Sequence, residues 1–254
     1  MRRIGIVTAM RVEARCITRL RLPFDRKMSL NENAAIWLCG MGSSRARIAA
    51  EGLRAQGATA LMSFGFAGGL DPTLRPGDLL LPESIAAHQA WRVDSDWRNC
   101  MQQRLSGCLS ARGGILASSE TVLTSAEEKN ELAATTGAVA VDMESASVAE
   151  VAASAGLPFL AVRAISDPVE FSPPGILLQA IRPDGSAALT RLLPLLLGGS
   201  VSVGALVRLA VDSRAACSTL SAVVRHASVE LGIDRHPAAV RGEYASGNLP
   251  GSHG

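Results

Sequence analysis

Residues 138–167 read AVAVDMESASVAEVAASAGLPFLAVRAISD. A short apolar run, AVAVDM, precedes a small-residue segment with helical character, SASVAEVAASAG, and a second apolar run spans residues 159–165. Gly156 and Pro158 stand between the helical segment and the second run, where they favour the end of a helix. The stretch therefore predicts a strand, a helix and a second strand in succession.

The same alternation occurs in the first third of the chain. Three more apolar runs with the character of buried parallel strands cover residues 4–8, 35–39 and 60–64. The first two lead into helical patterns over residues 11–20 and 43–56, and the third leads into a Gly/Pro-rich loop over residues 65–78. Alternating strands and helices predict an α/β fold with three layers, in which helices flank a central mixed, twisted β-sheet. The sequence has no internal repeat and no clear linker, so we expect a single domain over residues 1–232.

The C-terminal part has a different character. Residues 192–197 (LLPLLL) and 201–224 are apolar with helical spacing, and from residue 233 onward the chain is polar and rich in Gly, Pro, Ser and His. We expect residues 233–254 to form a disordered tail.

Composition excludes several classes of protein. Hydrophobic residues make up 48%, charged residues 19%, and the mean hydropathy is +0.22, which excludes a disordered or fibrous chain. A net charge of +2 and only 4% aromatic residues disfavour a nucleic-acid partner. The five cysteines and four histidines lack the spacing of a zinc site, so we predict no metal. The sequence has neither a signal-peptide pattern nor an apolar run of membrane-spanning length, which favours the cytoplasm.

Ligands of such sheets bind at the carboxyl ends of the strands. In this chain those ends carry carboxylates, one arginine and two glycine-rich segments: Glu13, Arg45, residues 65–69, Asp142, Glu144 and Asp167. We expect these groups to converge on one edge of the sheet and to form an active site.

Two interpretations stay open for each glycine-rich segment. GMGSSR, residues 40–45, is either a loop that binds an anion at a helix N-terminus or a tight turn capped by Ser43 or Ser44. It lacks the third glycine of a dinucleotide-binding loop. GFAGGLDPTLRPGD, residues 65–78, either presents backbone N–H groups to a ligand or only connects two elements.

Three carboxylates also allow two interpretations each. Glu144, at a predicted helix start, either interacts with the helix dipole or accepts hydrogen bonds from a vicinal diol such as that of ribose. Asp167 either belongs to an Asp-Pro turn or acts as a general acid. Glu13, in the first turn of a predicted helix, either caps that helix or acts as a general base for water.

Taken together, these segments resemble the superfamily of purine nucleoside phosphorylases and methylthioadenosine/adenosylhomocysteine nucleosidases. The resemblance covers about residues 3–170 and rests on five segments: IGIVTAMRVEA, CGMGSSRARIAA, SFGFAGGLDPTLRPGD, AVDMESASVAEVA and PFLAVRAISD. Longer stretches and the apolar C-terminal segments are similar to the hopanoid-associated phosphorylases, which remove adenine from adenosylhopane and leave a ribosyl hopane.

The resemblance implies roles for individual residues. Glu13 would activate water and Asp167 would protonate N7 of the purine, with Ser166 beside it. Met143 and Glu144 would contact the ribose, Glu144 through its 2′- and 3′-hydroxyls. The remaining implied contacts, near the nucleophile and the base, are Ala67, Gly68, Gly69, Val122 and Leu123. The family usually stacks an aromatic ring on the base at the position where this chain has Val122.

The nucleophile is either water or phosphate. Glu13 favours water because a carboxylate repels bound phosphate, and the Gly-Asp-Pro-x-Arg loop of the phosphate-using hexameric branch is absent. Arg45 with Gly42, at a predicted helix N-terminus, is the candidate phosphate site. We expect no cofactor, with phosphate as the only candidate co-substrate, and we expect the chain to form a homodimer.

The substrate we predict is adenosylhopane, a lipid-linked adenine nucleoside of hopanoid biosynthesis, with transient contact at the inner membrane. The alternative within the same chemistry is a salvage nucleosidase for methylthioadenosine or adenosylhomocysteine. Two other classes are a nucleoside-binding module without catalysis and a dinucleotide-dependent reductase. Glu13 and Asp167 disfavour the binding module, because binding alone needs neither of them.

Overall fold

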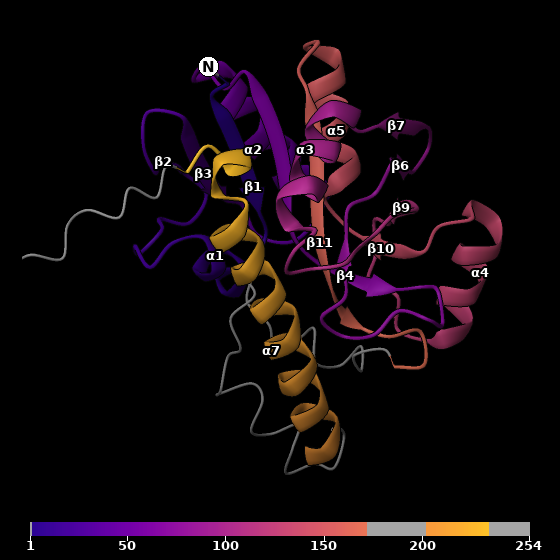
Figure 1. Ribbon diagram of the computed structural model, residues 1–254. Helices are drawn as coiled ribbons and strands as arrows, with labels where there is room; N and C mark the ends of the chain where they lie inside the picture. Colours follow the sequence, from indigo (N-terminus) through magenta and orange to yellow (C-terminus); the bar gives the residue numbers. More distant parts are fainter. Residues whose placement is uncertain (1, 172–201, 234–254) are drawn as a thin grey trace, which may run out of the picture.

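The ten-residue strand β4 (Ala60–Gly69) lies at the centre of the sheet. It pairs in parallel with β1 (Ile4–Thr8) on one side and with β11 (Phe159–Asp167) on the other. Its last two residues, Gly68 and Gly69, pair antiparallel with β10 (Ala140–Asp142). The sheet is therefore mixed, as predicted. The computed structural model describes residues 2–171 and 202–233 (Figure 1).

The other strands extend the sheet on both sides of this centre. Beyond β1 lie β3 (Ala34–Leu38), parallel to it, and β2 (Lys27–Ser29), antiparallel to β3. Beyond β10 lie β9 (Ile115–Ser118), β6 (Ser84–Ala86) and β7 (Ala90–Arg92). The remaining two strands, β5 (Leu79–Leu80) and β8 (Ala111–Arg112), continue from β11.

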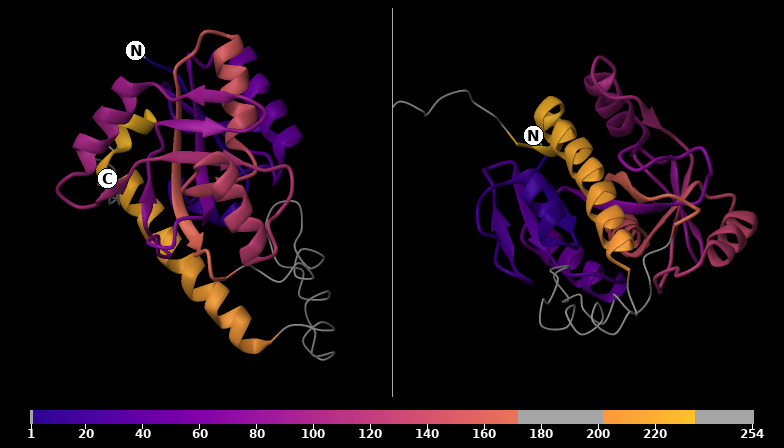
Figure 2. Two further views of the ribbon diagram at one scale, coloured as in Figure 1. Left: turned by 90° about the vertical axis from the view of Figure 1, so that its right-hand side faces the viewer. Right: turned by 90° about the horizontal axis from the view of Figure 1, so that it is seen from below.

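Helices cover both faces of the sheet (Figure 2). One face packs against α1 (Arg11–Ile17), α3 (Ser95–Leu105) and α7 (Val203–His226). The other face packs against α2 (Ser43–Ala55) and α5 (Ser145–Ser154). A further helix, α4 (Ala126–Thr136), lies beside β9. The predicted three-layer α/β architecture in a single domain is confirmed.

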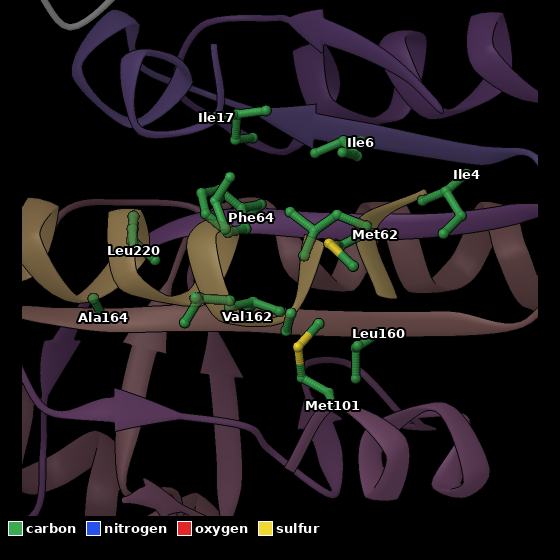
Figure 3. Packing of buried hydrophobic residues seen from close by; sticks show 14 of the residues in the cluster. Ile4, Ile6, Ile17, Met62, Phe64, Met101, Leu160, Val162, Ala164 and Leu220 are labelled. Carbon is green, nitrogen blue, oxygen red and sulfur yellow. The ribbon is translucent and has the colours of Figure 1, made fainter. Parts of the chain in front are cut away.

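The central strands are apolar because both of their faces are buried. Along β4, Met62 and Phe64 point to the layer of α1 and α7, while Leu61 packs on the layer of α2 and α5. On β11, Val162 joins Met62 and Phe64, together with Leu220 of α7 (Figure 3). Two apolar layers thus hold the strand ends that carry the site in fixed positions.

Several predicted boundaries need correction. The helix predicted over residues 11–20 ends at Ile17, because Thr18 takes extended backbone angles (φ −144°, ψ 146°). The loop predicted over residues 65–78 begins with strand as far as Gly69, because β11 and β10 offer backbone partners for these residues. The strand predicted from AVAVDM is limited to Ala140–Asp142.

The helix predicted over residues 201–224 is α7, followed by a short 3₁₀ turn, η2 (Ser228–Leu231). The first half of α7 extends past the carboxyl ends of β4 and β11 (Figures 1 and 2). The LLPLLL segment and residues 234–254 lie outside the described residues. Over residues 2–171 and 202–233, no helix has the combination of length and apolarity that crossing a bilayer requires.

Candidate active site

A cavity opens where β1, β3, β4, β10 and β11 end. Ten residues singled out from the sequence line it: Glu13, Ala67, Gly68, Val122, Leu123, Asp142, Met143, Glu144, Ser166 and Asp167. Met10, Met41 and Phe66 contribute apolar residues to the wall of the cavity. The strand ends therefore converge on a single cavity that combines four carboxylates, that of Asp142 included, with apolar surface.

Glu13 is buried and held by four donors. Its Oε2 accepts hydrogen bonds from Thr8 Oγ1 at 3.0 Å and from the backbone N–H groups of Ala9 (3.1 Å) and Met10 (2.8 Å). Its Oε1 accepts from the N–H of Phe66 at 2.8 Å. Burial raises the pKa of Glu13, and the Arg163 charge and these hydrogen bonds oppose that rise. The side chain thus caps α1 and also presents a carboxylate, fixed between β1 and β4, to the cavity.

Gly65 leaves the space that this arrangement needs. A Cβ atom on Gly65 would collide with Glu13 Oε1 and would lie 2.6 Å from Arg163 Nη1. Arg163, which is buried, forms an ion pair with Asp142 and hydrogen bonds to Ser63 Oγ (2.6 Å). This guanidinium is the buried positive charge beside the carboxylates of Glu13, Asp142 and Glu144.

Glu144 stands at the N-cap position of α5, but its side chain caps nothing there. Asp142 takes that role, because its Oδ2 accepts from the N–H of Ser145 at 3.1 Å. Glu144 Oε1 instead accepts from the N–H of Gly42 at 2.9 Å. Burial and the Asp142 charge raise the pKa of Glu144 to about 7, against the opposing influence of Arg163. The Glu144 side chain is therefore not the hydrogen-bonding cap of α5, and its ligand-binding role stays a prediction.

Asp167 lies at a bulge of β11, where the register against β4 shifts between Ile165 and Asp167. Its Oδ1 accepts a hydrogen bond from Ser166 Oγ at 2.7 Å, and its Oδ2 accepts from Lys129 Nζ at 2.6 Å. A Cβ on Gly68 would lie 3.0 Å from Oδ2. The turn that follows is closed by backbone atoms, from Phe171 N–H to the Pro168 carbonyl at 3.1 Å. The Asp167 carboxylate is thus free of the turn and borders the cavity.

Sequence reasoning missed two buried cations of this site, Lys129 and Arg163. Lys129 follows two glutamates in a polar helical pattern that is typical of a solvated surface, yet only 1% of it is exposed. Arg163 interrupts an otherwise apolar strand. A charged residue within such a strand is the one sequence signal that could have indicated a buried partner.

Three predicted residues lie outside the cavity lining. The guanidinium of Arg45 lies over the ring of Phe24, 5.7 Å from its centre, and the N–H of Gly42 is already donated to Glu144. Gly69 packs against the Asp167 backbone, with a Cβ position 3.3 Å from the carbonyl oxygen. Phosphate binding by Arg45 and Gly42 therefore stays a prediction, because neither residue lines the cavity that the carboxylates border.

Comparisons with known proteins establish the family. The family model described as the phosphorylase superfamily matches residues 3–196. The chain belongs to the phosphorylase superfamily. It is therefore an enzyme that cleaves N-glycosidic bonds, as the sequence predicted. No curated protein sequence matches the chain.

Two solved structures illustrate the fold that this superfamily member shares. One is futalosine hydrolase of Helicobacter pylori strain 26695, with 19% identity, a TM-score of 0.67, and coverage of 90% of this chain and 97% of the other. The other is 5′-methylthioadenosine/S-adenosylhomocysteine nucleosidase from Neisseria meningitidis in complex with methylthio-immucillin-A. It has 18% identity, a TM-score of 0.66, and coverage of 89% of this chain and 98% of the other. At these identities the likeness concerns the fold.

The raised pKa of Glu144 predicts how stability depends on pH. The folded chain holds this proton up to about pH 7, whereas an unfolded glutamate releases it near its ordinary value of 4.5. The contribution of this raised pKa to the free energy of unfolding is therefore complete below pH 4.5 and is lost as the pH rises through 7. We expect the thermal midpoint of Glu144→Gln, relative to that of the wild type, to increase between pH 5 and pH 8. Parallel pH profiles of the two proteins, measured by circular dichroism, would contradict the raised pKa.

Proposed function

We propose that this enzyme hydrolyses the N-glycosidic bond of an adenine nucleoside. The observation that carries the proposal concerns the carboxylates that border the cavity: beside Asp142, which is paired with Arg163, three of them have three different surroundings. Glu13 accepts hydrogen bonds from four donors. Glu144 accepts one from a backbone N–H, and its other oxygen has no partner among the described residues. Asp167 is paired with the ammonium group of Lys129. Different surroundings of this kind separate the chemical roles of otherwise similar groups.

The charges that develop on the sugar and on the purine during the reaction match the positions of these three carboxyl groups. Breaking the bond between C1′ and N9 builds positive character on the sugar and negative character on the purine. Glu144 accepts hydrogen bonds from the ribose hydroxyls and holds the sugar in place. Asp167 delivers a proton to N7 of the purine, which neutralises the leaving group. Glu13 accepts a proton from the water that attacks C1′.

Water is the nucleophile that the electrostatics favour over phosphate. A phosphate beside Glu13 would face three carboxylates. Of the two buried cations nearby, Lys129 donates to three acceptors and Arg163 is paired with Asp142. Arg45, the predicted phosphate ligand, contacts Phe24 instead. Among the residues that the structure describes, the cavity lining therefore offers a bound dianion no cation that is not already paired.

For the substituent at C5′ we propose the hopane side chain of adenosylhopane. Support comes from the segments that resemble hopanoid-associated phosphorylases and from α7, whose first half lies beyond the strand ends that border the cavity (Figure 1). That half exposes Val207 by 57% and Val211 by 59%, which is apolar surface for a lipid to contact. A homodimer and transient contact with a membrane belong to the same proposal.

Adenine release from a series of nucleosides tests this function. The series consists of adenosylhopane and adenosine with a long alkyl chain at C5′, each in detergent, compared with methylthioadenosine and adenosylhomocysteine. We expect kcat/KM to be higher for the long-chain compounds, since each buried CH₂ contributes about 0.8 kcal/mol. Efficient cleavage of methylthioadenosine with none of the long-chain nucleoside would instead identify a salvage nucleosidase. Tight binding without adenine release would identify a binding module.

The role of Glu144 predicts a dependence on the sugar. Glu144→Gln is expected to reduce kcat/KM for a riboside more than for the matching 2′-deoxyriboside, because the hydrogen bond that weakens is to a hydroxyl. The difference should correspond to about 1–3 kcal/mol. Glu150→Gln is the control, because it removes a glutamate of the same helix that pairs with Arg47 at the surface. Equal losses on both sugars would limit Glu144 to a structural role.

A further inference from the structure

Lys129 is the most deeply buried charged residue at the cavity, with an exposed fraction of 1%. Its ammonium donates to Asp167 Oδ2 at 2.6 Å and to the carbonyl oxygens of Pro168 and Phe171, both at 2.9 Å. An ammonium has three N–H donors, and each has one acceptor here. A neutral amine would leave one of these acceptors without a hydrogen, so the contacts fit a charged lysine beside a charged aspartate.

In this pairing Asp167 has no proton of its own to give to the leaving purine. Ser166 donates to Oδ1 of Asp167 and Lys129 donates to Oδ2, so both oxygens act as acceptors. A carboxylate with no proton cannot by itself protonate N7 of a leaving purine. The nearest transferable proton on the described residues is the one that Lys129 directs at Oδ2.

Two further observations indicate that lysine is needed here for more than its charge. The chain has 23 arginines and only two lysines, so arginine is its ordinary cation, and arginine does not release its proton. Lys129 is also the fourth residue of α4, within the first turn, where the helix dipole disfavours a cation. Burial and the dipole both oppose an ammonium at this position, and Asp167 is the charge that compensates for them.

We propose that Lys129 supplies the proton that Asp167 passes to the leaving purine, an inference that rests on the proposed hydrolysis. The proton moves from Lys129 Nζ to Asp167 Oδ2 and from there to N7, while the C1′–N9 bond breaks and its electron pair goes to the purine. Water bonds to C1′ and gives its proton to Glu13. Lys129 ends neutral and Asp167 ends as a carboxylate. Solvent then returns a proton to Lys129 and removes one from Glu13. Lys129 acts through Asp167 and is thus a positioning residue.

The alternative is a purely structural role, in which Lys129 ties the segment after β11 to α4. A leaving group that needs no proton separates the two roles. The p-nitrophenolate of p-nitrophenyl riboside leaves as an anion, whereas adenine requires protonation at N7. A structural defect would slow both substrates, but the absence of a proton source would slow only the adenine nucleoside.

The test compares wild type, Lys129→Ala and, as a control, Lys27→Ala, which removes the other lysine at a site far from the cavity. We expect Lys129→Ala to lower kcat for adenine release by about 10²-fold or more and to leave nitrophenolate release unchanged. Ethylammonium, added in solution, is expected to restore adenine release by occupying the space of the missing side chain. Thermal unfolding of each variant reports on the fold.

Three results would overturn the inference: equal losses on both substrates, full adenine release by Lys129→Ala, or no restoration by ethylammonium. Each of these three results can be interpreted only if the wild-type enzyme releases adenine. A wild type that releases adenine from no nucleoside would instead refute the proposed function itself, and the two failures are therefore distinct.

Discussion

Replacing Asp167 by asparagine is expected to lower kcat for adenine release by about 10²–10⁴-fold, the typical contribution of a general acid. The amide keeps the size of the carboxyl group and one of its acceptor atoms, but it cannot pass a proton from Lys129 to N7. Nucleoside binding should change little, because the contacts of Glu144 with the ribose remain. The measurement is single-turnover adenine release together with the Kd for the nucleoside.

The matched control is Asp71→Asn. Asp71 accepts a hydrogen bond from the N–H of Thr73 in the turn after β4 and does not border the cavity. We expect this variant to retain the wild-type rate. If Asp167→Asn also turned over at a rate near that of the wild type, Asp167 would be removed from the mechanism.

Replacing Glu13 by glutamine is expected to lower kcat for adenine release in phosphate-free buffer by about 10²–10⁴-fold. Glutamine cannot take a proton from water. Its NH₂ group would also face N–H donors that now point at a carboxylate, namely those of Phe66, Ala9 and Met10. A lower thermal midpoint is therefore expected as well, and rates must be measured well below it.

Arg45→Ala distinguishes the two nucleophiles. Because Arg45 lies over Phe24 and away from the cavity lining, the variant should release adenine at the wild-type rate in phosphate-free buffer. If release required phosphate and collapsed in Arg45→Ala, the enzyme would be a phosphorylase. Glu13 would then be limited to capping α1.

The sequence predicted the layers of this fold because its central strands are buried on both faces and carry an unbroken apolar signal. The same logic placed Glu13, Glu144 and Asp167 at one edge, since parallel strands end together. It did not predict that β4 continues to Gly69. Gly68 and Gly69 have weak strand preference of their own, and their pairing with β10 and β11 is a long-range effect.

The pairing of Lys129 with Asp167 was also beyond sequence reasoning. Lys129 is 38 residues away from Asp167 along the chain, and its neighbours Glu127 and Glu128 give it the pattern of a surface helix. Only the three-dimensional arrangement reveals that α4 buries this lysine against the end of β11. For the same reason, the sequence left open the role of Glu144 at the start of α5, where the structure shows that Asp142 accepts the hydrogen bond from the N–H of Ser145.

Hydrolysis is tested most directly by cleaving an adenine nucleoside with the wild-type enzyme in phosphate-free buffer made with H₂¹⁸O. We predict free adenine and a sugar that carries ¹⁸O on the C1′ hydroxyl, measured by mass spectrometry immediately after quenching. A control with the sugar alone corrects for exchange with the labelled water. Adenine that appears only after phosphate is added, together with a ribose 1-phosphate product, would contradict hydrolysis, and so would the absence of adenine under both conditions.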